Sequence, residues 1–382
     1  MKEKELYFIR PTGNPTFNYY FDKITTFILF FIKRTNSPIK NPKKILFIRN
    51  DHIGDMVYST QVFREVKKLF PDVKIAVLAT PSNKEIIEKN KNVDKIIVSD
   101  RFWKKGFKGF LNYFKVLGEI KKENFDVGVD LRRSKLNMFF YLFIPEIKRR
   151  VGYYNVNGGK AFLTHPFVCE EKMVNVFEIT KMVGKFFGAD IKNYWPEVQT
   201  DEQDEKDFQK IVKKNKLEKY VVFGPGATEE SKKWPEEKFN ELIERFHKKN
   251  HNYKIVLSGS EGDRSLIERL CDRRNYCVPL INFNLRKMAL VFKNSDVVVA
   301  NDGCGSDISW VAGGKLVTLV GPVDIEVHNP PKNTILLHHK LPCYPCQWAK
   351  PCKKPYGKWC MDLITVDEVL DAVEKQMKVN AK

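Results

Sequence analysis

The turn Arg49-Asn-Asp-His-Ile-Gly-Asp55 joins an apolar run to an amphipathic one and carries side chains that could act in catalysis. Asp55 opens the predicted helix, where backbone amides favour a negative charge. Its carboxylate could accept a proton from a substrate hydroxyl, although aspartate at such a place is commonly a plain N-cap. His52 could be a base or an uninvolved neighbour. No GxGxxG pattern follows this strand, which argues against a nicotinamide dehydrogenase.

Three further turns are rich in glycine and also follow predicted strands. Gly224–Thr228 leads to Lys232, and the amides, hydroxyls and ammonium groups there could hold a diphosphate. Ser258–Asp263 carries Glu261, which could bind a ribose diol or could belong to an ordinary loop. Asn301–Asp307 precedes an apolar helix whose first backbone amides could donate hydrogen bonds to a phosphate group. These turns together predict a site for a ligand that carries phosphate groups.

Four of the eight cysteines lie close together near the C-terminus. Cys343 and Cys346 form a CxxC pair, and Cys352 and Cys360 follow. Four thiolates at this density suit tetrahedral zinc or iron. We expect such a metal to be structural, because four protein ligands leave no open position. Disulfides and free thiols are the alternatives that this spacing leaves open.

The elements that position these turns are short apolar runs alternating with amphipathic ones. The predicted strands span residues 44–49, 74–79, 95–98, 125–130, 220–223, 254–258, 296–300 and 316–320. Strands that alternate with helices indicate parallel sheets covered on both faces. We therefore expect an α/β protein with two Rossmann-like domains that face across a cleft. Ligands should lie at the carboxyl ends of the strands.

The domain boundaries follow from changes in composition along the chain. Residues 1–42 are a leader in which a helix at Phe21–Lys33 could lie on a membrane surface or brace the folded body. We expect a first Rossmann-like domain over residues 43–195, a linker over 196–215 and a second Rossmann-like domain over 216–340. The cysteine segment and a C-terminal helix complete the chain over residues 341–382.

Composition narrows the class of protein and its partners. The chain has 382 residues, 43% of them hydrophobic, which excludes wholesale disorder and a collagen-like repeat. Its net charge of +19 favours a polyanionic partner. The longest apolar stretch, Ile24–Ile32, is too short to span a bilayer, and no secretory signal is found. We expect a cytoplasmic protein, with peripheral contact at the cytoplasmic face of the inner membrane left open.

The order and spacing of these motifs resemble the lipopolysaccharide heptosyltransferase family, glycosyltransferase family nine. The matching stretches are Lys44–Phe70, Gly224–Phe239, Ser258–Glu268, Asn301–Asp324 and Cys343–Val369. The resemblance implies a GT-B fold, with the acceptor bound mainly by the first domain and the donor by the second. It also implies metal-independent transfer of heptose from ADP-heptose, with inversion, to a lipopolysaccharide core or related glycan.

The resemblance implies a role for each residue at a matching position. Asp55 matches the general base that takes the proton of the acceptor hydroxyl. Thr228 and Lys232 match the ligands of the donor phosphates. Glu261 matches the residue that holds the nucleoside ribose, and Asp302 matches an acidic residue that contacts the donor sugar.

The chain departs from the family pattern beside the predicted donor sugar. Where the family commonly reads Asp-Thr-Gly-Pro-Met-His, this chain has Gly303 at the threonine and Asp307 at the histidine. Ala227 also removes one hydroxyl from the predicted phosphate site. A hexose or a differently modified heptose is therefore an alternative donor.

Basic and aromatic side chains of the first domain would suit an anionic glycolipid acceptor. They interleave over Arg101–Phe110, and His52, Arg132 and Arg133 are candidates for binding the acceptor. The same mixture suits single-stranded nucleic acid, which gives a second hypothesis of a non-catalytic polyanion-binding protein. That hypothesis does not explain Asp55 or the tandem turns, so we do not expect nucleic acid as the partner.

Overall fold

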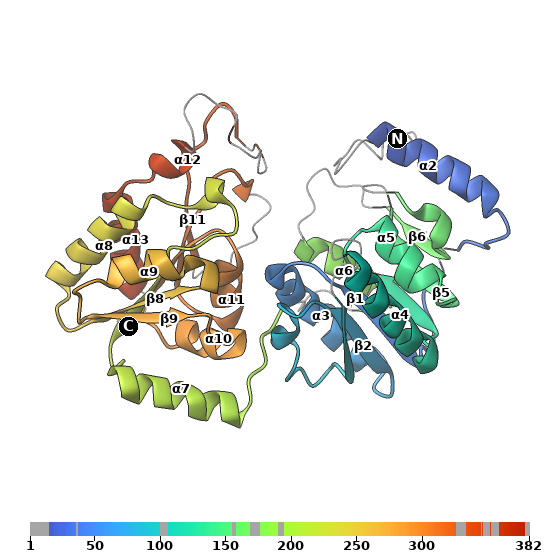
Figure 1. Ribbon diagram of the computed structural model, residues 1–382, viewed down its shortest axis with the longest axis horizontal. Helices are drawn as coiled ribbons and strands as arrows, with labels where there is room; N and C mark the ends of the chain where they lie inside the picture. The colour runs from blue at the N-terminus through green and yellow to red at the C-terminus, as the bar shows by residue number, and fades with distance from the viewer. Residues whose placement is uncertain are drawn as a thin grey trace. The chain divides into compact units, whose positions relative to one another are not determined.

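The computed structural model describes residues 15–35, 37–99, 106–154, 158–168, 176–189, 195–325, 334–344, 346, 352 and 359–378. The chain divides between Glu197 and Val198 into two compact units, here called unit 1 and unit 2. Each unit is built on a six-stranded parallel sheet with helices packed around it (Figure 1). Both sheets confirm the predicted α/β class.

The sheet of unit 1 has the strand order β3-β2-β1-β4-β5-β6. Ile45 to Ile48 of the central strand are fully buried, as expected where helices cover both faces of a sheet. The strands are β1 (Lys44–Arg49), β2 (Lys74–Ala79), β3 (Lys95–Val98), β4 (Val127–Asp130), β5 (Arg149–Tyr153) and β6 (His165–Phe167). The helices are α2 (Pro15–Ile28), α3 (Ile53–Leu69), α4 (Gly106–Glu123), α5 (Lys135–Asn137) and α6 (Val176–Phe186). Shorter elements are the 3-10 helices η1 (Lys84–Ile86) and η4 (Lys160–Phe162) and the π-helix η3 (Met138–Phe143).

The sheet of unit 2 has the strand order β12-β11-β10-β7-β8-β9. Trp234 and Phe239 lie at the centre of its core, with their rings 4.9 Å apart. The strands are β7 (Tyr220–Gly224), β8 (Lys254–Gly259), β9 (Cys277–Ile281), β10 (Val298–Asn301), β11 (Leu316–Leu319) and β12 (Thr334–Leu337). The helices are α7 (Glu202–Asn215), α8 (Glu236–Lys249), α9 (Arg264–Cys271), α10 (Leu285–Lys293), α11 (Cys304–Ala312), α12 (Trp359–Asp362) and α13 (Val366–Lys378), with short turns η5 (Glu230–Lys232) and η6 (Glu261–Asp263).

The leader helix lies earlier than the prediction of Phe21–Lys33. Helix α2 begins at Pro15, a residue that fits the first turn because its missing N–H is not needed there. It ends at Ile28, and the chain then turns so that the Thr35 amide donates to the Thr164 carbonyl. None of the described helices combines the length and apolar character that crossing a membrane requires.

The segment predicted as a linker, residues 196–215, is largely helical. Helix α7 begins with a capping box in which Asp201 and Asp204 bond each other's backbone amides. Asp204 then points into unit 2, where the Arg286 guanidinium donates to it at 2.9 Å. The two side chains are only 3% and 7% exposed. This buried ion pair fastens α7 to α10, so the segment is part of unit 2 from Glu202 onward.

Replacing the arginine of this pair should destabilise unit 2. We expect Arg286→Ala to cost roughly 3–5 kcal/mol, because Asp204 would keep a buried charge without its partner. The free energy of unfolding can be measured by urea titration followed by circular dichroism. Lys206→Ala, which removes only an exposed contact with Glu202, is the control and should be nearly neutral. Equal effects of the two variants would contradict the structural role of the pair.

Candidate active site

In unit 1 a charged cluster forms where β1 and β4 end. The two strands are parallel neighbours, with Ile48 opposite Asp130, so the residues that follow them meet at one edge of the sheet. Asp51 accepts from Arg49 at 3.2 Å, and the Arg132 guanidinium lies 3.7 Å from the same carboxylate. Asp130 accepts from the Ser134 amide at 2.8 Å. The cluster joins two segments that are far apart in the sequence.

Asp55 lies in this cluster, in the first turn of α3. The helix N-cap is His52, so the plain N-cap explanation of Asp55 does not apply. Burial raises the pKa of Asp55, and the neighbouring Asp51 raises it further. Arg49, His52 and Arg133 act in the opposite direction by stabilising its charged form. Asp55 is therefore a carboxylate held more basic than usual, as a general base requires.

The predicted acceptor residues gather around Asp55 and Asp51. Arg132 faces Asp51, while His52 and Arg133 lie within electrostatic range of Asp55. Arg133 has a φ of 67°, a left-handed conformation that is costly for a residue with a Cβ. Backbone strain of this kind is common at functional sites, where the surrounding structure maintains it.

Sequence reasoning gave no role to Arg49, Asp51 or Asp130, three residues of the cluster. Arg49 and Asp130 were assigned only as the last residues of strands, yet both are almost fully buried. Burial raises the pKa of Asp130 to about 6. Among the described residues, Arg49 Nη2 and Asp51 Oδ1 are buried polar atoms without a hydrogen-bond partner. The sequence signal that could have pointed to Arg49 and Asp130 is a charged residue at the end of a predicted apolar strand.

In unit 2 the residues after β7 and β10 meet in the same way. Gly224 lies opposite Ala300, which brings the glycine-rich loop beside the Asp302 turn. The Lys232 ammonium is 2.5 Å from Asp302 Oδ2, and the two side chains are 12% and 4% exposed. Lys232 and Asp302 were predicted from separate motifs, and the structure places them in one ion pair.

Asn301 holds the loop that carries Lys232. Its amide donates to the Pro225 carbonyl at 2.8 Å, and its oxygen accepts from the Trp234 amide at 3.1 Å. Both ends of the loop are therefore fixed by one buried side chain. In sequence this residue was only the start of a glycine-rich turn, so its role was not foreseen. Ser231 Oγ, within the loop, is a buried hydroxyl without a partner among the described residues.

The remaining predicted donor residues lie in neighbouring turns at this edge. Thr228 is exposed in the loop after β7. Glu261 is exposed and accepts from Arg264 at 2.6 and 2.9 Å, which holds its pKa below the usual range. Gly303 is the N-cap of α11, and a Cβ there would meet open space. Asp263, rather than Glu261, faces the glycine loop, where a Cβ at Gly226 would collide with it.

Residues in and after the cysteine segment contact neighbouring parts of unit 2. The Trp234 indole donates to the Ile364 carbonyl at 2.9 Å, and the Ile325 amide donates to the Tyr344 hydroxyl at 2.6 Å. Burial raises the pKa of Cys360 to about 11, and nearby Cys346, Cys352 and Cys343 contribute.

Cys360 thus lies within electrostatic range of the other three thiols, and the described cysteines form no disulfide. Within the described ranges, however, no three His, Cys, Asp or Glu side chains are arranged to hold a metal. The predicted metal site at Cys343, Cys346, Cys352 and Cys360 therefore stays a prediction.

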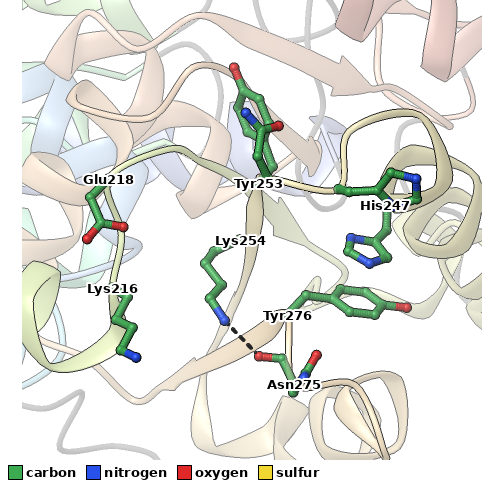
Figure 2. Close-up of a pocket in the computed structure, with 9 residues that line it drawn as sticks. Lys216, Glu218, His247, Tyr253, Lys254, Asn275 and Tyr276 are labelled. Carbon is green, nitrogen blue, oxygen red and sulfur yellow. Dashed lines mark hydrogen bonds between the residues drawn. The ribbon is translucent and has the colours of Figure 1, made fainter.

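A separate cavity of about 440 Å³ lies on unit 2 (Figure 2). Its lining includes His247, Tyr276 and Lys254, whose ammonium donates to the Asn275 carbonyl at 2.9 Å. These residues surround the amino-terminal ends of β8 and β9. The cavity is therefore at the edge of the sheet opposite the Lys232–Asp302 pair, and it is not part of the candidate site.

Residues 113–356 match the family model for glycosyltransferase family 9 (heptosyltransferase). The chain belongs to this family. It is 25% identical over 303 residues to lipooligosaccharide heptosyltransferase 2 of Haemophilus influenzae, across 75% of this chain and 85% of that protein. The predicted family and the assignment as a glycosyltransferase are thereby confirmed.

Solved structures share the fold. The family 9 glycosyltransferase of Veillonella parvula gives a TM-score of 0.78 at 19% identity, covering 89% of this chain and 99% of that one. The Escherichia coli heptosyltransferase WaaC, with ADP-2-deoxy-2-fluoro heptose, gives 0.67 at 17% identity, covering 87% and 99%. These likenesses confirm the GT-B fold of this family 9 chain. The iron-containing E. coli glycosyltransferase TibC is less similar. It gives a TM-score of 0.55 at 11% identity, covering 89% of this chain and 80% of that one.

The raised pKa of Asp55 predicts that its charge destabilises the fold. A carboxyl group with a raised folded-state pKa contributes stability at low pH, and this contribution is lost as the pH rises through that pKa. Asp55→Asn should therefore raise the melting temperature at pH about 8, with the gain shrinking toward pH about 4. Thermal unfolding measured across this range checks the prediction. The exposed Asp72→Asn is the control, and a destabilised Asp55→Asn variant at pH about 8 would contradict the assignment.

Proposed function

We propose that this family 9 member is an inverting transferase that moves heptose from ADP-heptose to a lipopolysaccharide core or related glycan. The observation that carries the proposal is the buried Lys232–Asp302 pair at the edge where β7 and β10 end. A diphosphate leaving group needs a preorganised cation there. The names of the relatives support the choice of sugar and acceptor, since one is a lipooligosaccharide heptosyltransferase and one structure holds an ADP-heptose analogue.

In the proposed reaction, Asp55 is the general base. Its carboxylate takes the proton of an acceptor hydroxyl while that oxygen attacks the anomeric carbon of the donor sugar. The bond from this carbon to the diphosphate oxygen breaks, and the configuration inverts in one displacement. His52, Arg132 and Arg133 would bind anionic groups of the acceptor, because His52 and Arg133 lie within electrostatic range of Asp55 and Arg132 faces the neighbouring Asp51.

Lys232 would stabilise the charge that develops on the leaving diphosphate, so the reaction needs no metal ion. Asp302 keeps the ammonium in place before the donor arrives and would contact the donor sugar. The hydroxyls of Thr228 and Ser231 would donate to phosphate oxygens. Glu261 would accept from the ribose, once its contact with Arg264 has opened.

The proposed acceptor also suggests where the enzyme works. A lipid-linked glycan presents phosphate and carboxylate groups at a membrane surface, and the net charge of +19 favours such a surface. We propose that the protein acts at the cytoplasmic face of the inner membrane as a peripheral protein.

Calorimetric binding of ADP-heptose tests the donor site. Lys232→Ala should weaken donor binding and turnover together by about tenfold or more, because a charge-assisted contact to phosphate is lost. The neighbouring Lys233→Ala is the matched control, since Lys233 pairs with the exposed Glu230. Asp55→Ala should bind donor nearly normally while transfer falls by about 100-fold or more.

Unchanged donor affinity in Lys232→Ala would remove this residue from the phosphate site. Binding of UDP, GDP or dTDP sugars in place of ADP-heptose would support transferase activity but rule out heptose as the donor sugar. The departures from the family pattern at Gly303 and Asp307 are compatible with such a donor. Binding of nucleic acid alone would favour the non-catalytic alternative.

We also propose that the four-cysteine segment holds one structural zinc or iron ion. Elemental analysis of protein purified without oxygen should then find about one such ion per chain. Cys343→Ser with Cys346→Ser should lose the ion and lower the melting temperature, because metal binding and folding are coupled. Cys271→Ser with Cys277→Ser, outside the segment, should retain it. Metal-free protein with reduced, reactive thiols would refute this assignment.

A further inference from the structure

Helix α2 packs on unit 1 through two polar side chains and through the partly buried rings of Tyr19 and Phe21. Asn18 and Asp22 are only 4% and 2% exposed. The Gly159 amide donates to Asp22 at 2.5 Å, and the Lys135 ammonium donates to Asn18 at 3.0 Å. The helix is therefore fastened to unit 1 by buried polar contacts, with Phe21 adding a ring contact to Phe162.

The opposite face of α2 and the turn after it present apolar side chains to solvent. Phe27, Phe30 and Phe31 are 81%, 80% and 68% exposed. The remaining members are Phe17, Tyr20, Ile24 and Ile28, each more than half exposed. Their spacing of three and four residues places them along one stripe. A helix on the surface of a soluble protein normally has the reverse arrangement.

Helix α4 carries a second exposed apolar stripe. Its members are Phe107, Phe110, Leu111 and Phe114, at 76%, 47%, 56% and 52% exposure. On the other face of α4, Tyr113, Val116 and Ile120 are buried in the core of unit 1.

A chain of ring contacts connects the two helices through η3. Phe162, which touches α2, lies 5.0 Å from Phe139, and Phe139 lies 4.9 Å from Phe140. Phe140 lies 5.4 Å from Tyr113 of α4. Both helices lie on unit 1 (Figure 1), and rings of η3 contact Tyr113 of α4 and Phe162 of η4. The two stripes together are called the aromatic surface below.

Lysines accompany the aromatic surface. Lys23 and Lys33 are exposed along and after α2, and Lys108 and Lys115 are exposed on α4. The only acidic residue of α2 is the buried Asp22. Apolar rings with ammonium groups beside them match the boundary of a bilayer whose headgroups carry phosphate.

We propose that the aromatic surface docks this protein on an anionic lipid bilayer. The rings of Phe27, Phe30 and Phe31 enter the boundary between headgroups and acyl chains, and the lysines meet lipid phosphates. A second copy of the chain is a poorer occupant, because a symmetric contact would place these lysines against one another. The inference deepens the proposed function, on which it rests for the lipid-linked acceptor, but docking is measurable without turnover.

Co-sedimentation of the full chain with vesicles tests the proposal. Binding should be strong to phosphatidylcholine vesicles with about 30% phosphatidylglycerol, weak to phosphatidylcholine alone, and weaker at about 0.5 M salt. The triple variant Phe27→Ser, Phe30→Ser, Phe31→Ser should bind about tenfold or more weakly. These rings are so exposed that the fold should survive, which the melting temperature checks. Leu69→Ser with Leu363→Ser, at apolar sites elsewhere that are 41% and 42% exposed, should bind as the wild type does.

Transfer to a soluble, delipidated acceptor separates this proposal from the proposed function. The triple variant should keep that activity, since the aromatic surface is outside the catalytic cluster. Vesicle binding without activity on any sugar nucleotide would support docking and refute the function. Unchanged sedimentation of the triple variant would overturn docking. So would a wild type that binds no vesicle but forms a dimer that the triple variant loses.

Discussion

Parallel pairing of neighbouring strands is the constraint on which both clusters depend. Parallel strands end at the same edge, so the turns after β1 and β4 meet in unit 1, and those after β7 and β10 meet in unit 2. The Lys232–Asp302 pair joins residues 70 positions apart in the chain. Neither the loop that carries Lys232 nor the turn that carries Asp302 could position this pair alone. Asn301 adds the rigidity, because one amide side chain bonds both ends of the loop.

The two clusters use buried charge in different ways. In unit 2 a lysine and an aspartate form an ion pair at 2.5 Å, which holds a cation where we propose that the donor phosphates bind. In unit 1 carboxylates lie close together among arginines, and burial raises the pKa of both Asp55 and Asp130. A carboxylate that is costly to charge is a better proton acceptor. The chemistry proposed for each unit rests on this difference: the buried charge is paired in unit 2, and burial disfavours the charged carboxylates in unit 1.

Sequence reasoning predicted most strands because buried parallel strands are continuous apolar runs, and β1, β2 and β3 lie where they were expected. It also singled out Lys232 and Asp302, since glycine-rich turns after such runs are recognisable locally, and their roles in donor binding stay predictions. Arg49 and Asn301 were missed as site residues because their roles depend on which strands are neighbours, which no local pattern states. Helix α2 was misplaced, and the side on which it packs was not predicted, because composition does not show which side of a helix packs. Residues 196–215, which include α7, were taken for a linker, since the partner of Asp204 lies 82 residues away.

The central claim is a single displacement with Asp55 as the base, and the anomeric configuration of the product tests it most directly. Purified protein would be incubated with ADP-heptose and a lipopolysaccharide core acceptor, and the new linkage would be assigned by NMR. The account predicts inversion relative to the donor, with no product formed by Asp55→Ala. Retention of configuration, or normal product from Asp55→Ala, would contradict it.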